Sequence, residues 1–225
     1  MRRSFRHEWM DDPAATEADF AAALRDLEFL GRISLGPRPV LAYLDRLVAR
    51  TGARHLSVLD VGAGGGDMLR AIAAWGARRG ITLALTGLDR SPWAEKYARA
   101  AGTDAAWLTH DLFDLPTEQT FDVVLCSLFT HHLNDEEMVR FLRWLPDHAR
   151  LGWMISDLHR HWLPWVALWL GTRALRLAPM VIHDSTISVA RSFVRADLTR
   201  LIAQAGMAAR VRWVFLFRWV IESAA

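Results

Sequence analysis

A cluster of glycines follows a short apolar segment near residue 60. The segment Val58-Leu59-Asp60-Val61 continues directly into Gly62-Ala63-Gly64-Gly65-Gly66-Asp67. Glycines at 62, 64 and 66 allow a tight turn and let a ligand approach the backbone without a Cβ in the way. A helix that begins near Asp67 would point its free N–H groups at that ligand. The pattern favours a nucleotide or nucleoside cofactor at the carboxyl edge of a parallel sheet.

Acidic residues follow two later apolar segments. Asp89 comes directly after residues 82–88, and Asp111 lies three residues beyond the segment 105–108. A carboxylate at the end of a parallel strand can accept hydrogen bonds from both hydroxyls of a ribose. The alternative for Asp89 is that it caps a helix over residues 91–99, and the two roles are compatible.

The glycine spacing separates two classes of cofactor. A dinucleotide-binding G-x-G-x-x-G sequence that starts at Gly62 needs glycine at position 67, where this chain has Asp67. The chain instead reads G-x-G-x-G, with Asp60 two residues before the first glycine. This resembles motif I of the class I S-adenosylmethionine-dependent methyltransferases. Residues 85–92, 109–116 and 121–133 are similar to further motifs of that family, in the same order and spacing.

The resemblance implies a set of residues that bind S-adenosylmethionine as cofactor. In the family, the residue at the place of Asp89 binds the ribose, the residue at the place of Arg90 lies against the adenine, and the counterpart of Asp111 takes the adenine amino group. Arg90 departs from the more usual apolar residue, although a guanidinium plane can stack on a base. The predicted cofactor-binding residues are Asp60, Gly62, Ala63, Gly64, Gly66, Asp89, Arg90, Asp111, Leu112 and Ser127.

Histidines after the fourth and fifth predicted strands are the candidates for a catalytic base. The resemblance implies transfer of a methyl group from a sulfonium to a nucleophile, and a phenol with a pKa of about 10 would need a base near neutral pH. Histidine suits this role because its pKa lies near working pH. We rank His132 first, then His159, then His131. The chain has 9 histidines, so most of them must be structural or exposed.

A Trp-rich segment over residues 158–194 is predicted to form a lid on the acceptor site. It contains Trp162 and Trp165 and ends near Arg191. It resembles the corresponding segment of methyltransferases that act on phenolic lipids and aromatic polyketides, and more distantly that of quinone methyltransferases. Trp and Leu side chains would make an apolar pocket, and Arg191 could orient an anionic oxygen. The alternatives are an ordinary buried helix face for the tryptophans and a solvated arginine.

The elements that must position these residues alternate between strands and helices. Strands are predicted over residues 57–61, 82–88, 105–108, 121–126, 152–156, 207–214 and 218–222. Strand–helix alternation predicts an α/β fold with a mostly parallel sheet, and the last two strands are close enough for an antiparallel hairpin. The expected architecture is therefore a three-layer, Rossmann-like methyltransferase fold with seven strands. Predicted helices over 16–31 and 40–52 form an N-terminal helical cap, residues 1–52, before a methyltransferase domain over 53–225.

Composition limits the other classes of function. The net charge is only +2 without a basic tract, so nucleic acid is not an expected partner. The single cysteine, Cys126, excludes an intramolecular disulfide and an all-cysteine metal site, and no metal site is expected. No signal peptide or membrane-spanning run is evident, so a cytoplasmic monomer or homodimer is expected, with peripheral membrane contact allowed but no stable insertion.

The resulting expectation is a small-molecule methyltransferase of secondary metabolism. The favoured reaction is O-methylation of an apolar phenol, quinol or polyketide-type acceptor. The alternatives are C-methylation of a quinone-type or polyketide acceptor, and a non-catalytic cofactor-binding or membrane-surface module of the same fold. A nicotinamide-dependent reductase is disfavoured because Asp67 replaces the third glycine and no Tyr-x-x-x-Lys pair exists.

Overall fold

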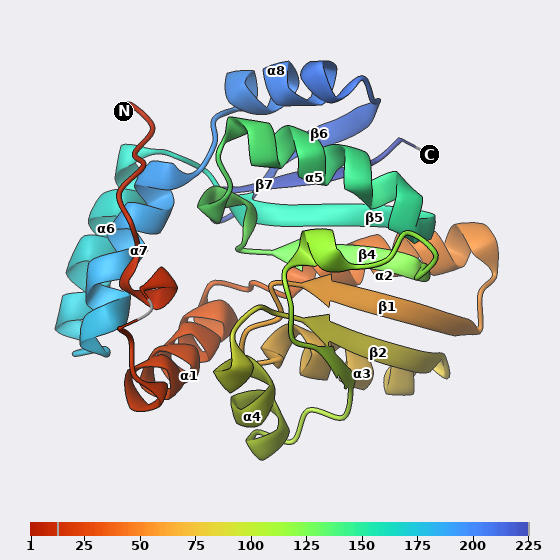
Figure 1. The fold of residues 1–225 in the computed structure, drawn as a ribbon, viewed down its shortest axis with the longest axis horizontal. Coiled ribbons are helices and arrows are strands. Elements are labelled where there is room, and N and C mark those ends of the chain that lie inside the picture. Colours follow the sequence, from red (N-terminus) through yellow and green to blue (C-terminus); the bar gives the residue numbers. More distant parts are fainter. Residues whose placement is uncertain (13, 225) are drawn as a thin grey trace.

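A seven-stranded sheet forms the centre of the protein (Figure 1). The computed structural model describes residues 1–12 and 14–224. The strands are β1 (His55–Val61), β2 (Thr82–Leu88), β3 (Ala106–Leu108), β4 (Phe121–Ser127), β5 (Ala149–Leu158), β6 (Ala209–Val214) and β7 (Arg218–Ser223). The helices are η1 (Trp9–Asp11), α1 (Glu17–Ile33), α2 (Arg38–Thr51), α3 (Asp67–Arg79), α4 (Pro92–Ala100), η2 (Leu112–Asp114), η3 (Thr130–His132), α5 (Asp135–His148), α6 (Trp162–Ala174), α7 (Pro179–Arg191) and α8 (Arg195–Ala205).

The strand order is β3-β2-β1-β4-β5-β7-β6. β1 pairs in parallel with β2 and β4, β2 pairs with β3, and β4 pairs with β5. β7 runs antiparallel to both β5 and β6. The connection from β6 to β7 over residues 215–217 is too short for a crossover, so these two strands form a hairpin. The predicted α/β fold, with a mostly parallel sheet and an antiparallel C-terminal hairpin, is confirmed.

The strand ends differ from the sequence prediction most at β5, and by one or two residues at every other strand except β2. β5 occupies Ala149–Leu158, whereas the apolar run alone predicted residues 152–156. Pairing extends the strand beyond that run, since Ala149 pairs with Phe121 of β4 and Leu158 pairs with Arg218 of β7. β6 begins two residues later than predicted, at Ala209.

Helices cover both faces of the sheet. On one face, Phe141 of α5 and Leu201 of α8 join a buried core with β4 and β5. On the other face, Leu44 of α2 and Ile72 of α3 are fully buried against β1. Because β1 and β4 are covered on both sides, their sequences read as nearly continuous apolar runs. This gives the three layers that the sequence predicted.

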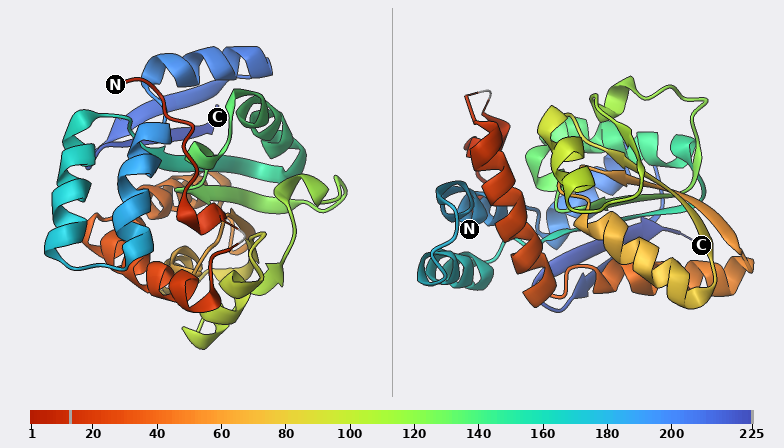
Figure 2. Two further views of the ribbon diagram at one scale, coloured as in Figure 1. Left: turned by 60° about the vertical axis from the view of Figure 1, so that its left-hand side comes forward. Right: turned by 90° about the horizontal axis from the view of Figure 1, so that it is seen from below.

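A second group of helices stands at the carboxyl ends of the parallel strands. η1, α1, α6 and α7 gather there, at the left of Figure 1, and Figure 2 shows the same grouping from two other directions. The predicted insertion over 158–194 forms α6 and α7 and contributes no strand of its own. No helix among the described residues is long and apolar enough to cross a bilayer.

The N-terminal helices divide between the cap and the core. α1 begins as predicted, because the Thr16 hydroxyl accepts a hydrogen bond from the backbone N–H of Asp19. α2 ends as predicted at Gly52, whose φ of 68° suits a helix terminus. The structure nevertheless differs from the predicted cap over residues 1–52, since α2 packs in the sheet core. Only the segment up to α1 lies with α6 and α7.

Candidate active site

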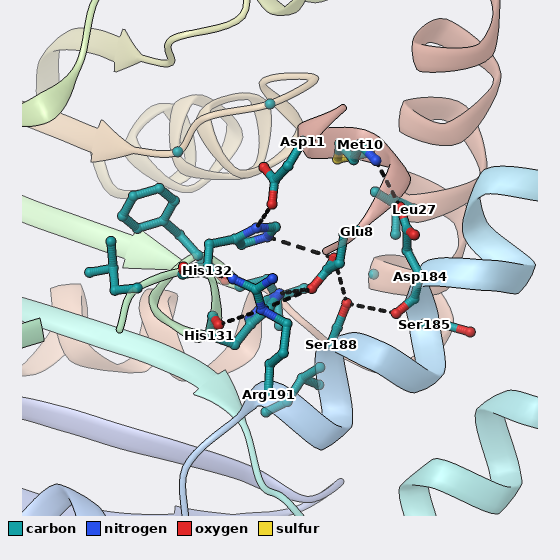
Figure 3. Close-up of a pocket in the computed structure, with 18 of the residues that line it drawn as sticks. Glu8, Met10, Asp11, Leu27, His131, His132, Asp184, Ser185, Ser188 and Arg191 are labelled. Carbon is teal, nitrogen blue, oxygen red and sulfur yellow. Dashed lines mark hydrogen bonds and ion pairs between the residues drawn. The ribbon is translucent and has the colours of Figure 1, made fainter. Parts of the chain in front are cut away.

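A cavity of about 1410 Å³ lies between the carboxyl ends of the strands and the helices of the cap. The glycine loop after β1 and the segments after β2 and β4 line one wall. Residues 3–11 and helices α1, α6 and α7 line the other. In a doubly wound α/β fold this edge of the sheet is where ligands bind. The close-up in Figure 3 shows the part of the cavity beneath the N-terminal segment.

The glycine loop has the backbone conformation that its sequence predicts. Gly62, Gly64 and Gly66 have φ values of 71°, 49° and 68°, a region that favours glycine. A Cβ at Gly62 would lie 2.8 Å from the Phe129 ring, so the loop passes too close to the segment after β4 for any side chain. Gly62, Ala63 and Gly64 line the cavity. Gly66 does not, because it packs against Thr103 behind the loop.

Three carboxyl groups surround this loop, of which Asp60 is buried and Asp67 and Asp89 are half-buried. Burial raises the pKa of Asp60, and the charges of Asp67 and Asp89 raise it further. Burial also raises the pKa values of Asp67 and Asp89. None of the three forms an ion pair within residues 1–12 and 14–224. A ligand that brings positive charge, as a sulfonium and an ammonium group do, would favour the ionised form of these carboxyl groups and offset the cost of their burial.

Asp89 lines the cavity and also holds the backbone on both sides of it. Its Oδ2 accepts a hydrogen bond of 2.9 Å from the N–H of Gly64, and its Oδ1 accepts one of 2.9 Å from the N–H of Ser91 before α4. It therefore links the glycine loop to the start of α4 while it lines the cavity. A ligand ribose here would meet a carboxylate whose orientation is already fixed.

The remaining predicted cofactor residues complete the same wall. Arg90, Asp111, Leu112 and Ser127 all line the cavity. Asp111 accepts a hydrogen bond from the N–H of Phe113 and so begins η2, and Leu112 is buried. Nine of the ten residues predicted to bind the cofactor thus meet at one surface, and Gly66 is the exception.

His131 and His132 follow β4 in η3, and each ring is held by a carboxylate. His131 Nδ1 lies 2.8 Å from Asp157 Oδ1, and His132 Nδ1 lies 2.8 Å from Asp11 Oδ2. Burial would lower the pKa of His131, but the charge and hydrogen bond of Asp157 outweigh burial and raise it. His131 is buried, whereas the side chain of His132 is 20% exposed and faces the cavity.

Asp11 joins the two ends of the site. Its Oδ1 pairs with Arg90 at 2.7 Å and its Oδ2 accepts from His132. Burial opposes ionisation of this carboxyl, but the hydrogen bond and charge of His132, with the charge of Arg90, bring its pKa down to about 2. Asp11 is therefore a carboxylate at neutral pH. It connects the residue beside the expected adenine position to the leading candidate for the base.

Glu8 belongs to the N-terminal segment and faces both histidines (Figure 3). Its Oε1 is 3.9 Å from His131 Nε2, and its Oε2 is 3.9 Å from His132 Nε2. One donor atom from each of the three residues lies within 4.8 Å of the other two, a spacing that could hold a metal ion. The expectation of no metal site did not take this grouping into account, because Glu8 was not among the predicted residues.

Three predicted residues occupy other positions than expected. His159 is outside the cavity lining and packs between Phe217 and Trp219, and burial lowers its pKa. Trp162 and Trp165 are also outside the lining, and Trp162 is 60% exposed. Other residues of α6 face the cavity instead, namely Leu163, Pro164, Ala167 and Leu168.

Arg191 lines the cavity, but its guanidinium is engaged by the protein itself. It donates to the backbone carbonyls of His131, His132 and Arg6 at 3.0, 2.7 and 2.8 Å. These bonds fix η3 and the N-terminal segment relative to α7. The arginine that was predicted to orient an anionic oxygen is thus bound to the chain's own carbonyl groups.

Sequence reasoning missed Glu8, Asp11 and Asp157. Glu8 and Asp11 stand in a charged N-terminal segment without helical or strand periodicity, so no local signal separates them from solvated surface residues. Asp157 was visible at the end of the fifth strand, where a polar residue after the apolar run lies at the ligand-binding edge.

Comparisons with known proteins agree with the fold and the glycine loop. Residues 58–152 match the family described as a methyltransferase domain. A ubiquinone biosynthesis O-methyltransferase of Nitrosomonas europaea is 28% identical over 179 residues, which are 74% of this chain and 69% of that protein. One of Xanthomonas oryzae pv. oryzae is 34% identical over 98 residues, which are 41% of this chain and 38% of that protein.

Two solved structures share the architecture at low sequence identity. The plantazolicin methyltransferase BpumL in complex with SAH has a TM-score of 0.66 and 16% identity, over 96% of this chain and 93% of that one. The magnesium protoporphyrin IX methyltransferase from Synechocystis PCC 6803 with bound SAM has a TM-score of 0.54 and 18% identity, over 84% and 77%. Residues 58–152 are thus similar to a methyltransferase domain, and the chain shares the fold of these two methyltransferases.

Proposed function

We propose that this enzyme transfers a methyl group to an oxygen atom of an apolar aromatic small molecule, a phenol, quinol or polyketide-type acceptor. The observation that carries the proposal is that the glycine loop with Asp89 and the η3 histidines with Asp11 line one continuous cavity. Cofactor and acceptor would then lie in line across it, which is the main requirement for displacement at a sulfonium. The matched relatives named as O-methyltransferases support oxygen over carbon.

The cofactor would lie along the strand-side wall and supplies the electrophilic methyl group when bound. Asp89 would hold the ribose hydroxyls, and Asp111 and Leu112 would flank the adenine. Asp60 and Asp67 would face the positively charged end of the molecule. Gly62 and Gly64 leave room for it, because neither has a Cβ to project from the loop.

The acceptor would occupy the cap side of the cavity. Apolar side chains from two helices line that side, among them Leu24 and Leu27 of α1 and Leu163 and Leu168 of α6. An apolar wall opposite a small number of fixed polar groups is typical of a small-molecule site. It favours an acceptor with a ring or alkyl chain on one side and a hydroxyl on the other.

We propose His132 as the general base when no metal ion is bound between Glu8, His131 and His132. Because Asp11 accepts from Nδ1–H, the Nε2 atom of the neutral ring carries the lone pair. The Asp11 carboxylate would also stabilise the imidazolium that forms when His132 takes the proton of the acceptor hydroxyl. His131 is more deeply buried, and His159 lies outside the cavity lining.

A methyl-labelled cofactor screen tests the proposed function. Incubation with phenols, hydroxybenzoates, quinols and alkylresorcinols should place the label on an acceptor oxygen, as fragmentation of the product by mass spectrometry would show. Label on a ring carbon would support the alternative of C-methylation. Binding of S-adenosylhomocysteine without label in any of these acceptor classes would support a non-catalytic cofactor-binding protein.

Peripheral association with membranes is a second candidate function, favoured by the outer face of α6. Trp162, Trp169 and Leu170 are 60%, 42% and 55% exposed there. Exposed Trp and Leu on a helix suit a membrane interface. We expect the double variant Trp162→Ser/Trp169→Ser to co-sediment less with anionic liposomes than the wild type while methyl transfer is unchanged. Equal and negligible co-sedimentation of both proteins would exclude this role.

A further inference from the structure

Two imidazole rings and a carboxylate face a common gap beneath the N-terminal segment (Figure 3). His131 Nε2 lies 3.9 Å from Glu8 Oε1, and His132 Nε2 lies 3.9 Å from Glu8 Oε2. Both separations are too long for a direct hydrogen bond. The three groups therefore converge without bonding to one another.

The other ring nitrogens determine what the two Nε2 atoms offer. Each Nδ1 lies 2.8 Å from a carboxylate oxygen, of Asp157 for His131 and of Asp11 for His132. A carboxylate accepts, so Nδ1 carries the hydrogen and the Nε2 of a neutral ring presents a lone pair. Both Nε2 atoms and the Glu8 carboxylate are then placed as possible ligands around one gap. A cation in this gap would be bound by all three groups.

Glu8 is buried and has one carboxylate oxygen that such a cation could bind. The residue is 3% exposed, and its Oε1 has no hydrogen-bond partner in the described part of the chain. Its Oε2 accepts from the Ser188 hydroxyl at 2.9 Å. Arg191 Nε lies 3.7 Å from Oε1, but the hydrogen bonds of that guanidinium go to three backbone carbonyls. Oε1 is thus buried and free to bind an ion.

We propose that Glu8, His131 and His132 bind a divalent transition-metal ion of the zinc class. Two imidazoles and one carboxylate form a ligand set for zinc and leave a fourth position open, whereas Mg²⁺ and Ca²⁺ favour all-oxygen ligands. Metal–ligand bonds of about 2.0–2.2 Å would bridge these donors after a small contraction. The carboxylates on both Nδ1 atoms are the outer partners that orient metal-binding histidines.

The open position would face the cavity, because His132 is the partly exposed member of the set. Binding of the ion is independent of the proposed function, whereas its catalytic role rests on that function. An acceptor hydroxyl that coordinates the ion would lose its proton to water in the cavity more readily, since a bound metal lowers the pKa of a coordinated oxygen. In the ion-bound protein His132 would thus act as a ligand, and in the ion-free protein as the base.

Cobalt substitution and zinc calorimetry on the untagged full chain test the site. After removal of metal with a chelator, we expect one Zn²⁺ to bind per chain and Co²⁺ to give visible absorption bands of a low-coordinate nitrogen and oxygen site. Glu8→Gln and His132→Asn should each weaken zinc binding at least a hundredfold. His55→Ala, which removes an exposed histidine at the far end of β1, should bind like the wild type.

Zinc X-ray absorption spectroscopy of the wild type reports the ligands of the ion directly. It therefore tests the site even where a variant unfolds. Two imidazole ligands support the site; a spectrum without imidazole ligands, or no binding by the wild type, overturns it. Methyl transfer by metal-free protein in the absence of any zinc binding would reject the metal site and leave the proposed function intact. Specific zinc binding without methyl transfer to any acceptor would support the metal site and reject the proposed function.

Discussion

His132 shows how a single residue depends on distant parts of the chain. Its ring is positioned by Asp11, which lies 121 residues away in the sequence. Its backbone carbonyl is held by Arg191 from α7. The residue that faces the acceptor side of the cavity is therefore fixed from two other elements, η1 and α7. Such support is what precise alignment of a nucleophile with a methyl group requires.

Replacement of His132 should separate catalysis from cofactor binding. We expect His132→Ala to lower kcat by roughly a hundredfold or more, whether the ring acts as base or as metal ligand. The affinity for S-adenosylhomocysteine should stay near that of the wild type, because His132 lies on the acceptor side. Steady-state kinetics and calorimetry check the two expectations. An unchanged kcat would remove His132 from the mechanism.

The role of individual residues could be predicted only where a local pattern carries it. The turn at Gly62 and the strand-end position of Asp89 follow from glycine spacing and apolar periodicity, and the structure brings them together at the cavity. Glu8 and Asp11 had no such signal, since their contacts with η3 are long-range. Trp162 was predicted from the Trp-rich composition of its segment and from a resemblance, and neither determines the face of a helix on which a side chain lies.

At the scale of elements, a residue of α2 makes the stability of the fold depend on pH in the alkaline range. Tyr43 on this helix is buried against the sheet, and burial raises its pKa to about 12. In the unfolded chain the phenol ionises near pH 10. The folded state binds the phenol proton of Tyr43 more tightly than the unfolded chain does. The contribution of this proton to stability is therefore complete below pH 10 and is lost as the pH rises towards 12.

Tyr43→Phe should therefore flatten the pH dependence of unfolding. Between pH 9 and pH 11 the wild type should lose about 1.4 kcal/mol more of its free energy of unfolding than the variant does. Urea unfolding at three pH values measures this difference. Tyr97→Phe is a matched control with a smaller expected effect, because Tyr97 is only partly buried. Parallel curves for the wild type and Tyr43→Phe would contradict the assignment.

The elements of the core were predictable because their residues repeat with a clear period. The bounds of β2 agree with the prediction at both ends, since an apolar run is followed directly by Asp89. The placement of α2 was not predictable. Its apolar face would suit a cap or a sheet equally well, and only the burial of Leu44 against β1 decides between them.

At the scale of the whole molecule, the N-terminal segment ties the cap to the catalytic edge of the sheet. Arg3 bonds the backbone carbonyls of Leu133 and Arg191, and the Asp184 carboxylate accepts from the N–H groups of Trp9 and Met10. The segment thus lies across the cavity between α7 and η3 (Figure 2). It contributes Glu8 and Asp11 to the site. Cofactor wall and acceptor wall consequently depend on one another for their geometry.

The central claim is that this cavity holds the cofactor against the glycine loop and Asp89. Calorimetry of S-adenosylhomocysteine with the wild type, Asp89→Ala and His132→Ala tests it most directly. The wild type and His132→Ala should bind alike, and Asp89→Ala should bind at least tenfold more weakly, which corresponds to about 1.4 kcal/mol for the lost ribose contacts. Unchanged affinity in a folded Asp89→Ala protein would contradict the assignment of the site.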